Sequence, residues 1–495
     1  MQIKSERLCS VIISAPRVGA ANNPTKEKHQ VSDLEILSVN ANKVEDSAAL
    51  TGSIVPTFIK YLIPSLVGLI AMTSASLVDG IFIGNYVGTT ALAAVNLIIP
   101  ITTLMFGVGI MLSIGGSVRS GKYLGEKKVA AASAIFSKTL LSVVFYGCVA
   151  IVLALIFETK LFSALGATSE LFPIMSEYYR IIIPFLLPQL ITVVLYFFVR
   201  MDGAPNLAAA ALMVGAVINM VLDYFFIAVY GWGLEGAAYA TGLSQLFSMS
   251  VLMFYFTTTN RVLSFGIRQS NWGEVFQAAY NGVSEFINEI SGGIIALIFN
   301  WMLIQRAGVD GVAAITVVNY LLMLGFMAFF AISDSIQVMV SQNFGAGNSK
   351  RIRQFMITAT VAVALMSAAF ISALLLTGES LILMFVDDHN SNKTIGLANS
   401  FITYVWPLFL FAGINMLVSG YLTAIHLPFQ SGLIALCRSL VFPATLLILF
   451  YFLLTDYLFV VALPIAEALS FILAVTIFLR YTPTKVIQHN LAKAS

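Results

Sequence analysis

Two aspartates stand inside long apolar stretches, where a charged side chain needs an explanation. Asp79 lies in SLVDGIFIG, and Asp223 lies in GAVINMVLDYFFIAVYGWG. An ionised carboxylate at the centre of a membrane costs about 3 kcal/mol on insertion scales, so such residues are functional candidates by default. Each aspartate lies a few residues before the C-terminal end of its predicted helix, and the two helices cross the membrane in the same direction. We therefore expect the two carboxylates to lie at similar depth.

Further polar residues accompany Asp223. Asn219 is four residues before it and Gly215 four before that, so the three share one helical stripe. The next helix runs back across the membrane, which brings Thr241 to a depth comparable with that of Asp223. Two carboxylates, an amide carbonyl and a hydroxyl are hard oxygen ligands, which suit a sodium ion or a shared proton. The alternative is that Asp79 and Asp223 only cap helix ends or reach water at the membrane surface.

A second group of acids lies in the other half of the chain. Glu285 and Glu289 are four residues apart in GVSEFINEISGG and share a helix face. Either could line a cleft and attract a cationic substrate. The alternatives are an ion pair with Arg438 or a position near the cytoplasmic surface. Glu467, close to Pro464, is expected to serve packing.

The composition shows which elements must position these groups. Of 495 residues, 59% are hydrophobic and only 10% are charged, and the mean hydropathy is +0.92. So little charge cannot cover a water-soluble surface, which excludes a soluble enzyme and a nucleic-acid-binding module. The apolar runs are too long for the strands of a barrel. We predict an all-α polytopic membrane protein with twelve transmembrane helices, over 54–83, 91–117, 133–157, 174–199, 207–229, 235–256, 276–304, 312–340, 354–376, 396–420, 431–453 and 457–480.

The chain divides into two lobes between polar ends. We predict a disordered cytoplasmic tail over 1–50, an N-lobe with helices 1 to 6 over 51–257, a C-lobe with helices 7 to 12 over 258–482, and a cytoplasmic tail over 483–495. Lys and Arg concentrate in alternate connections, and the positive-inside rule then places both termini in the cytoplasm. The residues on that side are Arg119, Lys122, Lys127, Lys128, Arg200, Arg261, Arg268, Lys350, Arg351, Arg353, Arg480, Lys485 and Lys493.

The two halves resemble each other at an offset of 220 residues. Gly88, Ser113 and Gly125 recur as Gly308, Ser333 and Gly345, for example. Equivalent helices are six apart, an even number, so the halves insert in the same direction as pseudo-symmetric parallel repeats. Two facing lobes imply a central cleft and alternating access, which favours transport over catalysis.

The remaining residues support no enzyme. Three cysteines and four histidines are scattered without metal-ligand spacing. A nucleophile elbow is absent as well. A membrane scaffold or receptor, the other rival class, would not need acids at matching depth. We therefore expect no cofactor apart from a coupling ion.

Several long patterns resemble one transporter family. LIPSLVGLIAMTSASLVDGIFIGNYVGTTALAAVNLIIPI, RMDGAPNLAAAALMVGAVINMVLDYFFIAVYGWGLEGAAYATGLSQ and SQNFGAGNSKRIRQ are similar to segments of multidrug and toxic compound extrusion (MATE) transporters, with the MepA-like bacterial branch nearest. The resemblance covers about residues 52–482. It implies drug export driven by inward flow of sodium ions or protons, with an N-lobe cation site at Asp79, Asn219, Asp223 and Thr241.

The sequence also departs from the family pattern. A tyrosine often found one turn before the helix-1 aspartate is Ala75 here. The deeper helix-7 acid of another branch falls near Gly292, so Glu285 and Glu289 cannot inherit its role.

We expect a sodium- or proton-coupled antiporter that exports drugs or dyes, often cationic, across the cytoplasmic (inner) membrane as a multi-pass monomer. Its partners would be the lipid bilayer and small molecules, with no nucleic acid. The rival within transport is a lipid-linked precursor flippase of a related superfamily. Such a flippase needs a cationic cleft for a pyrophosphate, and Arg438 is the only buried arginine candidate.

Overall fold

The computed structural model describes residues 47–259, 261–383 and 392–494. Within these ranges the chain is helical without strands, and twelve helices are long and apolar enough to cross a membrane. The predicted fold class is therefore confirmed. Residues 1–46, most of the predicted N-terminal tail, lie outside the described residues.

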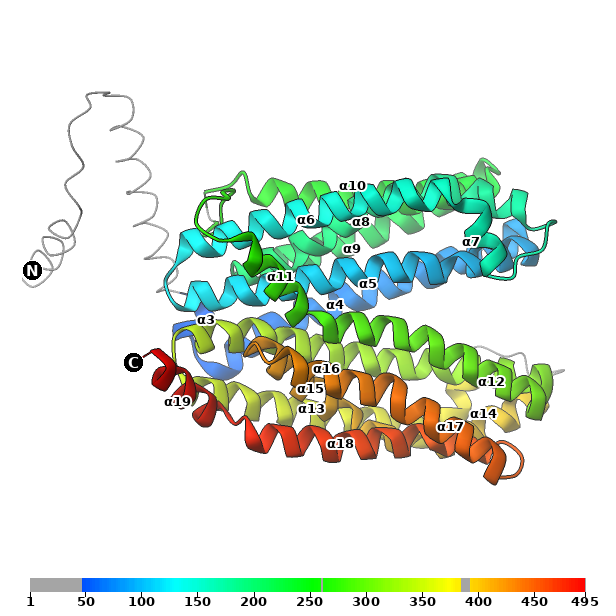
Figure 1. Ribbon diagram of the computed structural model, residues 1–495. Coiled ribbons are helices and arrows are strands. Elements are labelled where there is room, and N and C mark those ends of the chain that lie inside the picture. Colours follow the sequence, from blue (N-terminus) through cyan, green and yellow to red (C-terminus); the bar gives the residue numbers. More distant parts are fainter. Residues whose placement is uncertain (1–46, 260, 384–391, 495) are drawn as a thin grey trace, which may run out of the picture.

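The helices form two groups that lie one above the other in Figure 1. The first holds α4 (Ile54–Phe82), η1 (Ile83–Val87), α5 (Thr89–Gly125), α6 (Val129–Ile156), α7 (Glu158–Ala164), α8 (Phe172–Met201), α9 (Pro205–Asp223), η2 (Tyr224–Val229) and α10 (Gly233–Tyr255). The second holds α12 (Val283–Gly345), α13 (Ser349–Leu383), α14 (Asn392–Val405), η3 (Trp406–Leu410), α15 (Ala412–Ala424), α16 (Pro428–Leu436), η4 (Cys437–Val441), α17 (Phe442–Leu453), η5 (Leu458–Val461) and α18 (Ala462–Arg480). Three shorter helices, α3 (Ala48–Thr51), α11 (Trp272–Asn281) and α19 (Pro483–Ala494), lie toward one end.

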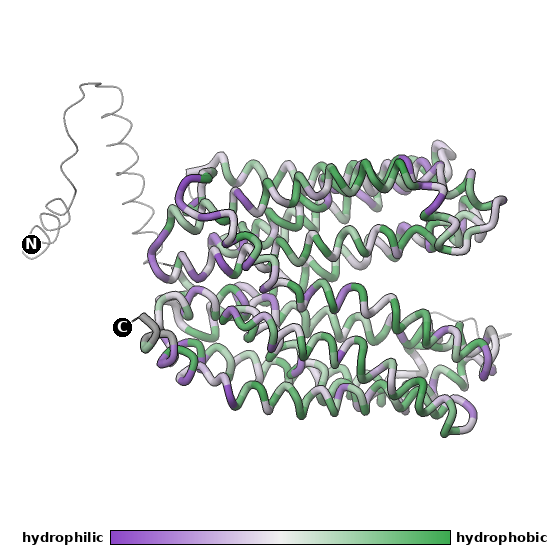
Figure 2. Tube along the Cα trace, viewed as in Figure 1, coloured by the Kyte–Doolittle hydropathy of each residue, from purple (hydrophilic) through white to green (hydrophobic). Residues whose placement is uncertain are grey.

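The outer faces of the long helices are apolar. Phe145, Leu376 and Phe452 have exposed fractions of 74%, 82% and 77%. Hydrophobic residues extend along the helices, whereas hydrophilic residues gather mainly toward their ends and in the connections (Figure 2). Such a surface suits a lipid environment, because a large exposed apolar area is unfavourable in water.

The internal repeat appears in the backbone. Gly88 separates the first span from the second, and its equivalent Gly308 ends the seventh span at a non-helical kink within α12. Both glycines take positive φ, 116° and 67°, which side chains with a Cβ rarely adopt. The repeated glycine signal in the sequence therefore marks equivalent turns in the two halves.

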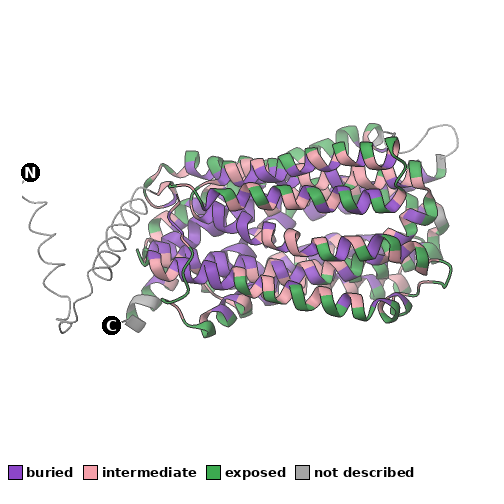
Figure 3. Ribbon diagram, turned by 90° about the horizontal axis from the view of Figure 1, so that it is seen from above, coloured by how far each residue is buried: buried purple, intermediate pink, exposed green. Residues whose placement is uncertain are grey.

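The halves contact each other at the end that carries α3 and α19, where buried residues gather (Figure 3). A Cβ on Gly125 would overlap the carbonyl oxygen of Gln342, and a Cβ on Gly345 would overlap that of Lys122. Because 122 and 342, like 125 and 345, are 220 apart, α5 and α12 meet through equivalent residues. This end of the interface therefore has pseudo-twofold symmetry and backbone-to-backbone packing.

A buried ion pair also joins the halves. Arg200 of α8 contacts Asp334 of α12, with side-chain exposures of 1% and 2%. Arg200 also lies over the Tyr196 ring, 5.1 Å from its centroid. The sequence predicts Arg200 in a connection between spans, whereas the structure places it in the last turn of α8 with its side chain buried. Its positive charge is compensated by a partner from the other half, which allows it to be buried.

The chain ends also differ from the predictions. Ala49, counted in the tail, is in α3 and accepts hydrogen bonds from Asn343 (2.8 Å) and Arg351 (3.1 Å) of the second half. The predicted helix 276–304 is interrupted at Gly282, because 272–281 form the separate helix α11. The C-terminal residues form α19, which packs on α13.

Candidate functional site

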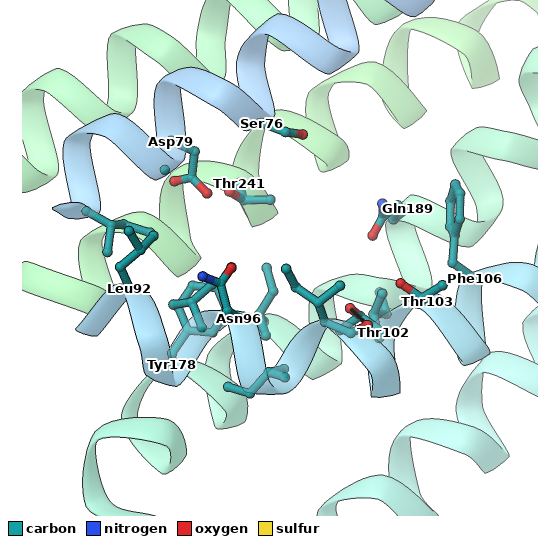
Figure 4. A pocket seen from close by; sticks show the side chains of 17 residues that line it. Ser76, Asp79, Leu92, Asn96, Thr102, Thr103, Phe106, Tyr178, Gln189 and Thr241 are labelled. Carbon is teal, nitrogen blue, oxygen red and sulfur yellow. Dashed lines mark hydrogen bonds between the residues drawn. The ribbon is translucent and has the colours of Figure 1, made fainter. Parts of the chain in front are cut away.

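Asp79 stands where the first span changes its helical geometry. It lies in the last turn of α4, and its carbonyl accepts from the amide of Ile83, where the π-helical segment η1 begins. A π-helical turn shifts the register of the following residues, and such turns are frequent at functional sites. The side chain is half-buried and lines a cavity (Figure 4).

Asp223 occupies the matching place in the fifth span. It is the last residue of α9, directly before the π-helical segment η2, and its side chain is fully buried. Asn219, one turn earlier, and Gly215, two turns earlier, are buried on the same stripe. A Cβ on Gly215 would overlap the Ser248 hydroxyl, so this glycine lets α10 approach α9.

The structure brings the four predicted residues together. Asn219 Nδ2 donates to Thr241 Oγ1 at 3.4 Å, and Thr241 lines the same cavity as Asp79. Asp79 and Asp223 lie close enough for their carboxyl groups to interact. Their predicted role in binding a coupling ion stays a prediction.

The carboxylates are poorly satisfied. Oδ1 of Asp79 and both side-chain oxygens of Asp223 are buried, and within the described residues they have no hydrogen-bond partner. Buried polar atoms are normally hydrogen-bonded, and a buried carboxylate is normally paired. Two such groups together need a proton or a cation. The oxygen-only donor set fits a hard cation such as sodium.

The cavity beside these residues has a volume of about 320 Å³ and lies within the first half. Figure 4 shows Asp79 and Thr241 on one side and Asn96 and Thr102 across from them. Sequence reasoning missed several polar lining residues, namely Asn96, Thr102, Thr103, Tyr178 and Gln189. Asn96 and Gln189 could have been found as amides inside apolar spans, but hydroxyls satisfy their own helix backbone, as Thr102 does, and give a weak signal.

Glu285 and Glu289 line a second, smaller cavity of about 140 Å³. Most of its lining comes from the second half, with Ile110 of α5 on the other side. Glu285 is buried and accepts long hydrogen bonds of 3.5 Å from Asn288 and Gln337. Glu289 is half-buried and close to Gly107 of α5. Both acids therefore lie near the interface between the halves.

The alternative of an ion pair between these glutamates and Arg438 is wrong. Arg438 Nε lies 3.0 Å from Glu467 Oε1, and Asn415 donates to Glu467 Oε2 at 2.7 Å. Glu467 is thus part of a charged cluster, not a packing residue alone. Arg438 is the second residue of η4, so a π-helical segment lies at a charged residue here too, as η1 and η2 follow Asp79 and Asp223.

The described residues contain no group of three or more His, Cys, Asp or Glu side chains that could hold a metal ion. The oxygen site contains only two acids, with an amide and a hydroxyl as its other ligands. A tightly bound transition metal is therefore not favoured by the donor set, because such metals prefer nitrogen and sulfur ligands.

Comparisons with known proteins agree with this architecture. The MatE family model matches residues 64–225 and 287–449, one match in each half. Multidrug export protein MepA of Staphylococcus haemolyticus is 23% identical over 381 residues, covering 75% of this chain and 82% of that protein. A FAD transporter of Shewanella oneidensis is 26% identical over 392 residues, covering 76% and 83%.

Solved structures share the fold. A crystal structure of MATE in complex with MaL6 has a TM-score of 0.83 at 21% identity, covering 89% of this chain and 99% of that one. An outward-facing multidrug resistance MATE family transporter has a TM-score of 0.83 at 22% identity, covering 89% and 98%. With the family model matching in both halves, the chain belongs to the MATE family of multidrug efflux transporters.

Proposed function

We propose that this protein is an antiporter that exchanges sodium ions or protons for organic compounds, often cationic drugs or dyes, by alternating access. The observation that carries the proposal is the cluster of buried carboxylate oxygens at Asp79 and Asp223, which find no hydrogen-bond donor among the residues that the structure describes. Such a cluster is stable only when a proton or a cation reduces its charge. It therefore supports a site that binds and releases a positive ion.

Coupling follows from the difference between the loaded and empty sites. Binding of the ion neutralises charge and draws Asp79 of α4 toward Asp223 of α9. An ion that binds one arrangement of the helices more tightly shifts the population toward it. If the two arrangements also differ in affinity for a compound in the cavity, ion entry favours its release.

The charges near the cavities favour organic cations. Asp79 is the one charged residue lining the larger cavity within the described part of the chain. The smaller cavity has Glu285, Glu289 and Arg438, and Arg438 is already paired with Glu467. Anionic compounds with a pyrophosphate, such as FAD or a lipid-linked sugar precursor, would meet uncompensated carboxylates. We therefore favour multidrug export over FAD transport and over the flippase alternative.

The position in the cell is part of this proposal. Basic residues at the end with α3 and α19 support placing that end, and both termini, in the cytoplasm, with the chain in the cytoplasmic membrane. Because one chain supplies both halves and both cavities, a monomer is sufficient for the cycle.

The test uses purified protein in liposomes loaded with a fluorescent cationic dye. Dye movement is measured under an imposed sodium gradient, an imposed proton gradient, and neither. We expect one gradient to drive dye movement against its concentration, and labelled FAD to remain in place. Movement of FAD but not of the dye, or equal rates without any gradient, would contradict the proposal.

A further inference from the structure

The helix α11 differs from the spans around it. It has ten residues, follows the connection after α10, and crosses obliquely from the first group of helices to the second (Figure 1). One residue, Gly282, separates it from Val283, where the next span begins. Neither its length nor its direction is that of a transmembrane helix.

The side chains of α11 fall into three sectors. At about 100° per residue, Trp272, Phe276 and Tyr280 occupy one arc of about 80°. Their exposed fractions are 49%, 77% and 54%. Gly273 and Gln277, also exposed, border this arc on one side. Val275, Ala278 and Asn281 occupy the opposite side and are buried.

Close backbone contacts fix the buried sector. A Cβ on Gly115 of α5 would overlap the carbonyl oxygen of Ala278, and a Cβ on Gly282 would overlap that of Met111. Glu274 accepts a hydrogen bond from Tyr123 and lies 3.7 Å from Arg119. Because α11 cannot rotate about its axis against these contacts, its aromatic sector must point away from the protein.

The beginning of α11 is fixed as well. Asn271 caps the helix by accepting from the amide of Gly273 at 3.3 Å. The buried ammonium of Lys138 donates to the carbonyl of Ser270 and lies 5.2 Å from the centroid of the Trp272 ring. A cation near the face of an aromatic ring stabilises that ring in place.

We propose that α11 is an interfacial helix that binds the boundary between headgroups and acyl chains of the membrane leaflet at this end. Tyr280 is three residues before the start of a span, about 5 Å along a helix, so the chain itself holds it at the membrane boundary. Tryptophan and tyrosine prefer this zone, because their rings are apolar while their N–H and O–H groups reach water. The Gly273 and Gln277 edge then faces water.

Continuity with the rest of the lipid-facing surface supports lipid over a protein partner. The aromatic sector belongs to a helix that contacts α6, whose Leu141 and Phe145 are exposed by 48% and 74%. It also leads into α12, where Leu297 is exposed by 70%. The spans that α11 contacts or leads into therefore carry exposed apolar side chains, which suit lipid.

The binding has a consequence for the connection between the halves. The buried sector of α11 packs mainly on α5 and α6 of the first half. At its end, Asn281 Nδ2 donates to the Thr423 carbonyl of the second half at 2.8 Å, and Gly282 joins α11 covalently to that half. A lipid-bound α11 holds this joint at a fixed depth in the bilayer while the halves move. Transport is not needed for the binding itself, so a failed transport assay would not bear on it.

The experiment measures the depth of Trp272 by fluorescence. A variant with Trp272 as the single tryptophan carries Trp232→Phe, Trp301→Phe and Trp406→Phe and is reconstituted into phosphatidylcholine vesicles. Lipids brominated at positions near the glycerol are compared with lipids brominated near the chain end and with iodide in water. We expect shallow bromines to remove most of the emission and iodide to remove little.

A matched control lies on the same helix. In the same background, Trp272→Phe with Gln277→Trp moves the single tryptophan to the edge predicted to face water. We expect iodide to quench this variant strongly and bromolipids weakly. The proposal is overturned if Trp272 behaves like Trp at 277, or if neither quencher reaches Trp272, since a second copy or another protein would then cover the helix.

Discussion

At the scale of single residues, the charge of Asp79 is expected to decide whether the protein can couple entry of the ion to export of the drug. Asp79→Asn keeps the volume and removes the charge, so the pair with Asp223 no longer needs a cation or proton. We predict folded, membrane-inserted protein with efflux abolished and with cation-induced drug release lost. Dye efflux from cells and a binding assay with and without the ion measure the two effects.

Asp223→Asn should have the same effect, and the double variant should be no worse than either single one. When two residues form one site, either substitution alone removes the function of the site, so the effects of the two substitutions do not add. Wild-type efflux by Asp79→Asn at normal expression would contradict the coupling site. An Asn96→Ala variant is a useful comparison, because it changes the cavity wall without changing its charge.

The acids of the second cavity make a separate prediction about substrates. If Glu285 or Glu289 attracts cations, Glu→Gln there should weaken efflux of cationic dyes more than efflux of zwitterionic drugs. Glu289 should have the larger effect, because it is more exposed and close to α5, whereas Glu285 is buried against Asn288 and Gln337. Equal loss for both substrate types would point to a structural role.

His426, outside the spans, should make stability depend on pH. His426 lies in the connection between two spans, its Nε2 atom is buried, and its φ is 59°. Burial, with Lys122 and Arg119 nearby, lowers the pKa of His426 well below its usual value. The unfolded chain gains a proton near pH 6.5 but the folded one does not, so stability falls as the pH drops below about 6.5.

His426→Asn removes this term, and asparagine tolerates positive φ. We predict that the unfolding temperature in detergent falls less for this variant than for the wild type between about pH 7 and about pH 5. Identical slopes for the two proteins would show that His426 does not titrate differently on folding.

The residue types of the candidate site could be identified from the sequence, whereas most pairings could not. Acids in apolar stretches are rare enough to identify Asp79 and Asp223, and helical spacing adds Asn219. Partners of charges are different, because they depend on distances between helices remote in sequence. Arg438 therefore pairs with Glu467 instead of the glutamates of α12, and Arg200 with Asp334.

At the scale of elements, the spans followed from hydrophobic length, but their internal irregularities did not. The segments η1 (IGNYV), η2 (YFFIAV) and η4 (CRSLV) share no composition that marks them, because a π-helical turn changes the hydrogen bonding of a helix and not its residue types. The break at Gly282 was missed because α11 carries aromatics, which read as part of the following span. An amphipathic helix that packs on the protein differs from a membrane helix in which of its faces is apolar. A stretch as short as the ten residues of α11 does not show that difference in its sequence.

The short helix α3 gives a prediction at this scale. Ala49 and Gly52 carbonyls accept from Arg351 at 3.1 Å and 2.8 Å, so this segment ties the start of α4 to the second half. Deleting residues 1–45 should leave expression and efflux nearly intact, because these bonds remain. Deleting 1–53 should lower the unfolding temperature and the efflux, because Arg351 then loses both acceptors. Expression, melting curves and dye efflux of the two truncations test this, and loss of function in the shorter deletion would contradict it.

At the scale of the whole molecule, the repeat explains why the two halves close against each other as they do. Equivalent positions of α5 and α12 meet across a pseudo-twofold axis, so a small residue at one position of the repeat allows close contact from both halves. Gly121 and Ser341 are such a pair, 220 residues apart, and a Cβ on Gly121 would overlap the Ser341 hydroxyl. The contact is tight, but it must separate if a compound is to enter from this end.

A reversible cross-link tests whether it separates. In a background with Cys9, Cys148 and Cys437 changed to serine, Gly121→Cys with Ser341→Cys places two thiols where α5 and α12 lie in direct contact, and we expect a disulfide to form between them on oxidation. The Cβ of residue 121 also meets the flexible end of Met201, which can move aside. We predict that oxidation abolishes efflux and that reduction restores it, because the halves cannot part while the bond holds.

The control for this experiment is Gly121→Ala with Ser341→Ala, which adds the bulk of a Cβ at residue 121 without the bond. If that variant transports and the oxidised cysteine pair does not, steric crowding is excluded as the cause. The buried Arg200–Asp334 pair should separate in the same step. A neutral variant with Arg200→Gln and Asp334→Asn should therefore open more readily at this end. A cysteine at position 341 should then react with a membrane-impermeant maleimide faster in that variant than in protein that keeps the ion pair. Full efflux by the oxidised protein would mean that this end of the molecule stays closed throughout the cycle, and that compounds reach the cavity beside Asp79 by another route.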